Sequence, residues 1–206
     1  MGAAEDHAAM GDDAVAELTE RERARIVKSA VTPRPIAWVS SRSAEGVDNL
    51  APFSTYNYVS SANPVVHFSS PNADHGGLKD SARNALAVEE FAVNTVTAEQ
   101  MEVMDHTSAS EPPETSEFDL AGVETAECRT IDAPRVAEAP VTFECTRYDS
   151  IEIHDRITVF GEVQHVHVDE SVTTDGEIDT AKLPTVGRLG GPYYTVSEIQ
   201  EFERQY

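Results

Sequence analysis

The segment that most constrains the fold is residues 32–70, in which short apolar runs alternate with turn residues. Pro33 and Pro35 end any preceding helix, because the residue before a proline avoids the helical conformation. Val, Ile, Phe, Tyr and Trp then gather in runs that are too short for helices and are typical of strands. A chain organised in this way must build a sheet from short strands and tight turns. The predicted strands of this segment are residues 36–41, 47–50, 53–59 and 64–69.

The remainder of the chain adds further strands and few helices. A capping-box pattern at Thr19 and Glu22 predicts a helix start, and apolar residues at helical spacing predict a longer helix from Leu78. Many short strands with few helices predict a mainly β fold, a β-barrel decorated with helices. The predicted helices are residues 19–28, 78–89, 98–106 and 197–204; the further strands are residues 91–96, 141–148 and 157–168; residues 108–116 and 121–139 are predicted to be loop or irregular.

The charge of the chain is unusual for its length. It has 206 residues and a formal net charge of -22, and only Lys28, Lys79 and Lys182 are lysines among its 15 basic residues. Acidic surplus with scarce lysine suggests adaptation to high salt, where counterions screen self-repulsion; an ordinary acidic cytosolic protein is the alternative. Nucleic acid is an unexpected partner, because no basic stripe exists to neutralise phosphates.

Composition also predicts the organisation and location of the chain. Residues 1–17 are predicted to be an acidic disordered tail, and residues 18–206 to be a single domain. No apolar run approaches the roughly 18 residues that span a bilayer, and the N-terminus lacks the order of a signal peptide. We therefore expect no membrane association and a cytoplasmic protein. Cys128 and Cys145 are expected to be free, buried or half-buried thiols.

Common nucleotide and hydrolase motifs are missing from the sequence. No G-x-G-x-x-G follows a strand, the Walker spacing is absent, and no serine lies in G-x-S-x-G. Ordinary Rossmann dehydrogenases, P-loop NTPases and α/β-hydrolases are therefore disfavoured.

Two groups of polar residues are candidates for ligand binding. Lys79 and Ser81 stand at a predicted helix start, where free N–H groups and the helix dipole attract an anion. The alternative is that Asp80 and Ser81 only cap the helix while Lys79 is solvated. The second group comprises strand residues whose hydroxyl and amide groups can bond a polar ligand, or else simply face solvent. Its members are Ser54, Thr55, Asn57, Ser69 and Ser70.

Other residues have plainer predicted roles. His165 and His167 fall on one face of a strand and Glu162 on the other, so no third ligand is evident and no metal site is predicted. Trp38 is expected to pack in the core or at an interface between chains. His106 is expected to be a surface residue, although it could border the pocket.

The order of several motifs resembles the flavin reductase-like family of FMN-binding split barrels. The resemblance covers residues 26–196, and the motifs are specific in combination rather than singly. They are PRPIAWVSS, NLAPFSTYN, PVVHFSS, LKDSARN, FAVN, GEV and RLGGPYY.

The resemblance implies an FMN-binding split β-barrel, a homodimer, and an activity of NAD(P)H-dependent flavin reduction. The electron donor would be NADH or NADPH, the acceptor a partner oxygenase or another electron acceptor, and no side chain would act as acid, base or nucleophile. A flavoredoxin-type FMN electron carrier is the alternative, while a pyridoxamine-phosphate-type oxidase fits the motifs poorly. Where short members carry G-D-H, this chain has His154-Asp155-Arg156, which puts direct use of a nicotinamide nucleotide in doubt. The FMN contacts that the resemblance implies are Ser54, Thr55, Asn57, Lys79, Ser81 and Asn84, and also Ser69, Ser70 and Asp80.

Overall fold

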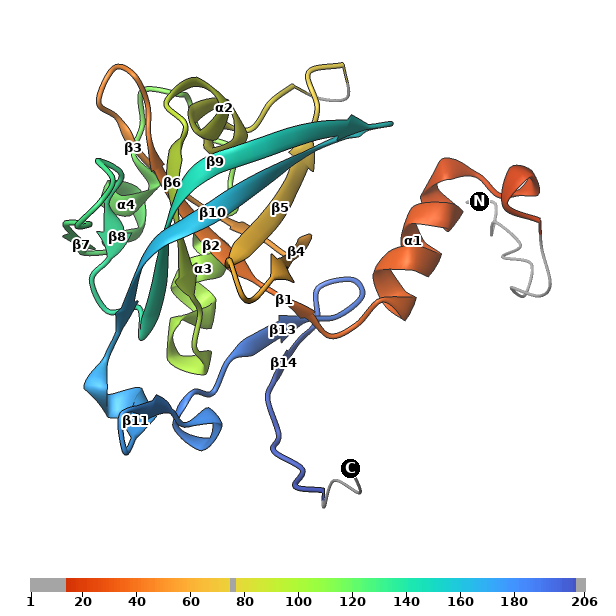
Figure 1. Cartoon of the computed structure of the whole chain (residues 1–206). Helices are drawn as coiled ribbons and strands as arrows, with labels where there is room; N and C mark the ends of the chain where they lie inside the picture. Colours follow the sequence, from red (N-terminus) through yellow and green to blue (C-terminus); the bar gives the residue numbers. More distant parts are fainter. Residues whose placement is uncertain (1–13, 75–76, 203–206) are drawn as a thin grey trace.

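A computed structural model describes residues 14–74 and 77–202 of the chain. Within these residues the body is a seven-stranded antiparallel sheet in the order β3-β2-β6-β9-β10-β5-β4 (Figure 1). Its strands are β2 (Ala37–Arg42), β3 (Asp48–Phe53), β4 (Tyr56–Ser60), β5 (Val65–Pro71), β6 (Glu90–Thr95), β9 (Val141–Ile153) and β10 (Arg156–Val168).

Short helices and strand pairs surround this sheet. The helices are η1 (Val15–Glu17), α1 (Glu20–Ala30), α2 (Asp80–Ala87), η2 (Ala98–Gln100), α3 (Met101–His106), α4 (Glu117–Ala121), η3 (Glu170–Val172) and η4 (Thr180–Lys182). The minor strands are β1 (Arg34–Pro35), β7 (Thr125–Ala126), β8 (Arg135–Val136), β11 (Thr173–Thr174), β12 (Glu177–Ile178), β13 (Val186–Arg188) and β14 (Tyr194–Val196).

The order of the strands forces the sheet to curl. β3 and β4 lie at its opposite edges, yet only Ser54 and Thr55 separate them along the chain. Two edges joined by so short a bend must meet, so the sheet closes on itself as a barrel that is split along this line. The predicted mainly β, split-barrel fold is confirmed.

Both faces of the central strands are buried. On β2, Ala37 and Val39 point into the barrel, whereas Trp38 packs outside it with Leu50 and Met104. Trp38 also donates its indole N–H to the Thr107 hydroxyl at 2.9 Å. The predicted core role of this tryptophan is therefore confirmed.

An aromatic stack fills the barrel interior. The rings of Phe53 and Phe68 have centroids 4.8 Å apart, and those of Phe68 and Phe91 are 5.3 Å apart. Edge-on and tilted contacts of this kind stabilise a core beyond the apolar area that they bury. The stack runs from the middle of the barrel to the end of β3, where the split begins.

Helix α1 projects from the barrel and buries none of its own residues (Figure 1). The capping box predicted at Thr19 and Glu22 is present. Arg34 holds the end of the helix, because its guanidinium donates to the carbonyls of Lys28 at 2.6 Å and Val31 at 2.8 Å. These bonds fix the helix at its C-terminal end.

Several predicted boundaries were wrong. The run 53–59 is interrupted, because β3 continues to Phe53 and the chain bends at Ser54 and Thr55 before β4. Residues 197–202 form no helix. The Ser197 N–H instead donates to the Thr185 carbonyl at 3.1 Å, and residues 203–204 lie outside the described range.

Helix α4 (Glu117–Ala121) was not predicted. Residues 15–17 of the predicted disordered tail form η1, and residues 1–13 are not described.

The cysteines agree with expectation. Both thiols are free, Cys145 buried and Cys128 half-buried. Burial raises the pKa of Cys128 to about 12 and raises the pKa of Cys145 as well. Among the helices of the described residues, none has the length and hydropathy needed to cross a bilayer.

Candidate functional site

A cavity of about 430 Å³ opens where the barrel is split. This volume lies within the roughly 300–1,000 Å³ typical of small-molecule sites. Its wall comes from the end of β3 and the bend after it, the end of β5, the start of α2 and the loop after α3. The lining residues include Asn49, Ala51, Pro52, Phe53, Ser54, Thr55, Ser69, Pro71, Leu78, Lys79, Asp80, Ser81, Arg83, Ser108, Ala109, Ser110, Glu111, Pro113 and Glu117, with Lys28 from α1 and Arg156 from β10.

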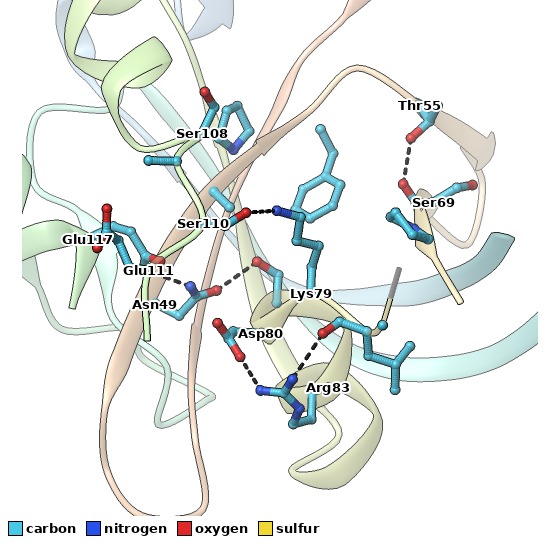
Figure 2. A pocket seen from close by; sticks show the side chains of 18 of the residues that line it. Asn49, Thr55, Ser69, Lys79, Asp80, Arg83, Ser108, Ser110, Glu111 and Glu117 are labelled. Carbon is cyan, nitrogen blue, oxygen red and sulfur yellow. Dashed lines mark hydrogen bonds and ion pairs between the residues drawn. The ribbon is translucent and has the colours of Figure 1, made fainter. Parts of the chain in front are cut away.

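Lys79 reaches across this cavity. Its ammonium group donates to the Ser110 hydroxyl at 2.5 Å, so it connects the start of α2 to the opposite loop (Figure 2). The bend after β3 and the end of β5 form a further part of the wall, where Thr55 donates its hydroxyl to the Ser69 carbonyl at 2.7 Å (Figure 2). The cavity is therefore framed by polar groups that come from three separate parts of the chain.

Positive charge gathers at the cavity although the chain as a whole is strongly acidic. Two of the three lysines, Lys28 and Lys79, line it together with Arg83 and Arg156. Arg83 forms an ion pair with Asp80 and donates to the Leu78 carbonyl at 3.0 Å. Three carboxylates, Asp80, Glu111 and Glu117, also line the cavity, so its four cations exceed its carboxylates by one. This balance makes the cavity a local exception to the net charge of -22 and favours an anionic ligand there.

The start of α2 is open to such a ligand. Lys79 occupies the N-cap position and makes no side-chain capping bond to the first turn. The first N–H groups of a helix need partners outside it, and together with the helix dipole they favour negative charge. A phosphate at this point would meet N–H groups and an ammonium group together.

A buried polar network fixes the geometry of this helix start. Ser81 donates its hydroxyl to Asn49 Oδ1 at 2.7 Å, and Asn49 Nδ2 donates to Glu117 Oε2 at 2.7 Å. Glu117 Oε2 also accepts the Leu50 N–H at 3.0 Å. The network links α2 to β3 and α4, which explains why a five-residue helix forms at residue 117.

Burial raises the pKa of the Glu117 carboxyl, while its hydrogen bonds oppose that shift and the charge of Asp80 adds to it. The fold therefore prefers the protonated acid. The stabilisation is complete below the ordinary pKa of 4.5 and is lost as the pH rises through the elevated value. Each unit of elevation costs about 1.4 kcal/mol once the group is ionised.

We expect Glu117→Gln to remove this pH dependence, because the amide oxygen can accept both bonds without a charge. Urea unfolding of the two proteins from pH 4 upwards checks it: wild type should lose stability relative to the variant as the pH rises. Glu114→Gln, at an exposed position in the preceding loop, is the control. Parallel pH curves for wild type and Glu117→Gln would show that the carboxyl is not destabilised by burial.

The structure brings six of the nine predicted site residues to the cavity wall. They are Ser54, Thr55, Ser69, Lys79, Asp80 and Ser81. Thr55 and Ser69 use their hydroxyls within the protein, the latter with Thr158 Oγ1 at 2.8 Å. Ser54 and Ser108 have no side-chain hydrogen bond among the residues that the structure describes. Their hydroxyls are therefore available to a ligand.

The other three predicted residues do not line this cavity. Asn57 is exposed on β4 and its side-chain oxygen accepts the neighbouring Tyr58 N–H at 2.9 Å. Ser70 is fully buried on the inward face of β5. Asn84 is on the buried face of α2, where it donates to the Ser41 hydroxyl at 3.1 Å and borders a neighbouring hollow of about 280 Å³. His106 does not line the cavity either.

Sequence reasoning missed the loop after α3 and two distant cations. Ser108 and Ser110 belong to a segment predicted only as loop, and Lys28 and Arg156 lie outside the quoted motifs and were given no role at the site. The rarity of lysine was the one available signal for Lys28. Asn49 was part of the quoted motif but was not given a role.

A second chamber adjoins the first. It has a volume of about 470 Å³ and shares Lys28, Pro52, Ser54 and Ser108 with the first cavity. Arg34 and Arg188 add two guanidinium groups there, and Arg188 lies over the Tyr194 ring at 4.4 Å. The free hydroxyls of Ser54 and Ser108 thus stand at the junction of two basic chambers.

Comparison with known proteins gives a consistent result. Residues 29–182 match the family model described as the flavin reductase like domain. An uncharacterized protein of Aquifex aeolicus is 39% identical over 171 residues, which cover 82% of this chain and 87% of that protein. Protein YwrF of Bacillus subtilis is 35% identical, over 86% of this chain and 90% of its own length.

Solved structures share the fold over nearly the whole chain. Nitrilotriacetate monooxygenase component B from Bacillus cereus superposes with a TM-score of 0.88 at 31% identity, covering 96% of this chain and 100% of that one. The 2-nitrobenzoate 2-nitroreductase NbaA of Pseudomonas fluorescens gives 0.85 at 28% identity, covering 95% and 98%. Nothing in the comparisons bears out the salt-adapted origin that the charge suggested.

Proposed function

Because the chain belongs to the flavin reductase-like family, we propose that it binds FMN in the 430 Å³ cavity and reduces it with NADH or NADPH. The observation that carries this proposal is the open start of α2 beside Lys79. An ammonium group and first-turn N–H groups that the N-cap side chain does not bond suit a phosphate, and the rest of the cavity has room for a ring system.

Each part of the cavity then has a role. Lys79 and the first turn of α2 hold the phosphate, and the Ser54–Thr55 bend with the Ser108 hydroxyl orients the polar edge of the ring. When bound, FMN supplies the hydride-accepting atom, so the protein binds and orients rather than acting as acid, base or nucleophile. The assignments of Ser54, Thr55, Ser69, Lys79, Asp80 and Ser81 as FMN contacts stay predictions, as do those of Asn57, Ser70 and Asn84.

The second chamber suits the nicotinamide nucleotide. Arg34 and Arg188 offer positive charge to its diphosphate, and the chamber joins the first at Ser54. Two nucleotides bound on either side of this junction would have their reactive rings near the same point. This arrangement supports direct reduction rather than electron transfer from a distant protein.

The proposed acceptor is a separate oxygenase that takes reduced flavin, in a cytoplasmic setting. The support is the name of one similar structure, which is component B of a monooxygenase. We also propose a homodimer. An 11-residue helix that buries none of its residues is marginal alone, and Val27 and Val31 on and beside it are each 59% exposed. A second chain would cover them.

A flavoredoxin-type carrier is the second candidate, and one observation favours it. His154 lies in the exposed turn between β9 and β10, and the residue near it that lines the cavity is Arg156, the first residue of β10. Among the residues described by the structure, no histidine lines the cavity. A carrier would bind FMN equally well but would react slowly with either nucleotide.

The test is an absorbance spectrum of the protein reconstituted with FMN, followed anaerobically by NADH and then NADPH. We expect a bound-flavin spectrum that one of the nucleotides bleaches. Analytical ultracentrifugation of the same protein should give the mass of two chains. Bound flavin that only a chemical reductant bleaches would replace the reductase by the carrier. A protein that binds no flavin would overturn both.

A further inference from the structure

Three side chains of metal-ligating types converge on the face of the β9–β10 pair that points away from the barrel interior. The ligand atoms of Glu144, His165 and His167 all lie within 4.8 Å of one another. None of the three lines either basic chamber. The cluster is therefore separate from the proposed flavin site and needs its own explanation.

Strand pairing and a bulge create this cluster. His165 and His167 alternate on β10 and share a face, and the cross-strand partner of His165 is Glu144 on β9. The register shifts between Val163 and His165, and bulges of this kind re-aim side chains. Parity along β10 placed Glu162 on the opposite face, and this was wrong, because the register shift puts Glu162, the partner of Thr146, on the same face as the histidines. The third side chain of the cluster is nevertheless Glu144, from the neighbouring strand.

Hydrogen bonds orient the carboxylate of Glu144, as they usually do for a carboxylate that binds a metal. It is fully buried, and it accepts the N–H groups of Arg129 and Thr130 at 2.7 Å each and the Thr130 hydroxyl at 2.5 Å. Its Oε1 atom also meets Nε2 of His167. Outer hydrogen bonds that orient a carboxylate are a regular feature of metal sites.

His165 distinguishes a metal site from a simple ion pair. A Glu144–His167 pair accounts for two of the three residues and leaves His165 without a role. The His165 ring is half-buried and meets His167 edge-on, with centroids 4.7 Å apart. Within the described part of the chain it has no side-chain hydrogen bond. One ion between the three would use all of them.

We propose that Glu144, His165 and His167 bind one zinc ion. Two nitrogens and one carboxylate oxygen are a ligand set that zinc accepts in tetrahedral geometry, with the fourth position left for water. Ligand atoms on such an ion lie roughly 3.4 Å apart, given metal–ligand distances near 2.1 Å and tetrahedral geometry. To reach this spacing, side-chain rotations would move the Glu144 and His167 atoms apart and adjust the position of His165. The ion would pin the segment at Arg129 and Thr130 to the sheet through Glu144.

The experiment is calorimetric titration of zinc into the full-length, tag-free protein after chelation, in excess Mg²⁺. Magnesium occupies oxygen-only sites on this acidic surface, whereas imidazole ligands select zinc. We expect one zinc per chain, a rise in melting temperature on binding, and a visible cobalt spectrum on substitution. His165→Ala should weaken zinc binding at least about tenfold, since even outer partners of a metal ligand contribute about 10- to 100-fold.

His167→Ala should weaken zinc binding similarly, and His106→Ala, at an exposed position on α3, is the matched control. Neither histidine variant removes the buried Glu144, so both should fold. Absence of stoichiometric zinc on the wild type, or binding that both variants retain, would overturn the site and leave an ion pair. None of these measurements requires flavin, so failure here is separate from failure of the proposed function.

Discussion

Lys79→Ala is expected to weaken FMN binding by about 1–3 kcal/mol, or roughly 5- to 150-fold, the range for losing a charged hydrogen-bond partner. Lys79 is the N-cap of α2, and its ammonium group spans the cavity to Ser110. The substitution removes the charge beside the first turn but leaves the helix N–H groups in place. Fluorescence titration of FMN at fixed ionic strength measures the change.

Lys182→Ala is the matched control for this prediction. It removes the same charge from the same strongly acidic chain, but Lys182 donates to the Thr173 carbonyl at 2.6 Å and lines neither basic chamber. The control separates the effect of losing a local contact to FMN from the effect of changing the net charge of the chain. If the two variants bind FMN equally well, the phosphate does not lie at the start of α2, and the placement of FMN must be revised.

The barrel strands and helix α1 could be predicted from the sequence, because local patterns of residues determine them. Alternating apolar residues located the strands of the barrel, and the capping box located α1. The run from Phe53 to Tyr56 looked continuous, because nothing local shows that two sheet edges must meet there. Closure of the barrel, a property of the whole sheet, bends the chain at Ser54 and Thr55.

Long-range contacts explain the other errors. Ser197 was assigned to a helix, but its backbone and hydroxyl bond to Thr185. Helix α4 depends on the bond from Asn49 to Glu117, a partner 68 residues away. The third residue of the histidine cluster was missed because it lies on the neighbouring strand.

For the site, the motifs located Lys79 and the Ser54–Thr55 bend, but they also contain residues that do not line this cavity. Alternation along β5 indicates the buried position of Ser70, since it shares the inward face of this strand with Val66 and Phe68. The sequence did not indicate that Asn57 lies on a strand separate from the bend at Ser54, because residues 53–59 were predicted to be one strand. The loop that carries Ser108 and Ser110 reaches the cavity only through the tertiary fold.

Gly161→Ala is expected to destabilise the protein by about 1–3 kcal/mol, the usual cost of overpacking a core. Gly161 is buried on β10 at a register shift, and it is part of the G-E-V motif. A Cβ atom there would lie 2.4 Å from Cζ of Phe91 and 2.9 Å from Cβ of Cys145. Both neighbours are fully buried, so neither can move aside. Thermal unfolding should show a fall in Tm of roughly 2–12 °C.

A double-mutant cycle identifies the clash as the cause. Phe91→Leu shortens the side chain that the new methyl group meets, so Gly161→Ala should cost less in that background than in wild type. An equal cost in both backgrounds would place the penalty in the strand backbone instead. The clash also connects stability to the site, because Phe91 packs on Phe68, and Phe68 on the Phe53 ring that lines the cavity. The absence of a side chain at Gly161 thus leaves room for Phe91, and through Phe91 it supports the aromatic stack and the cavity wall at the end of the stack.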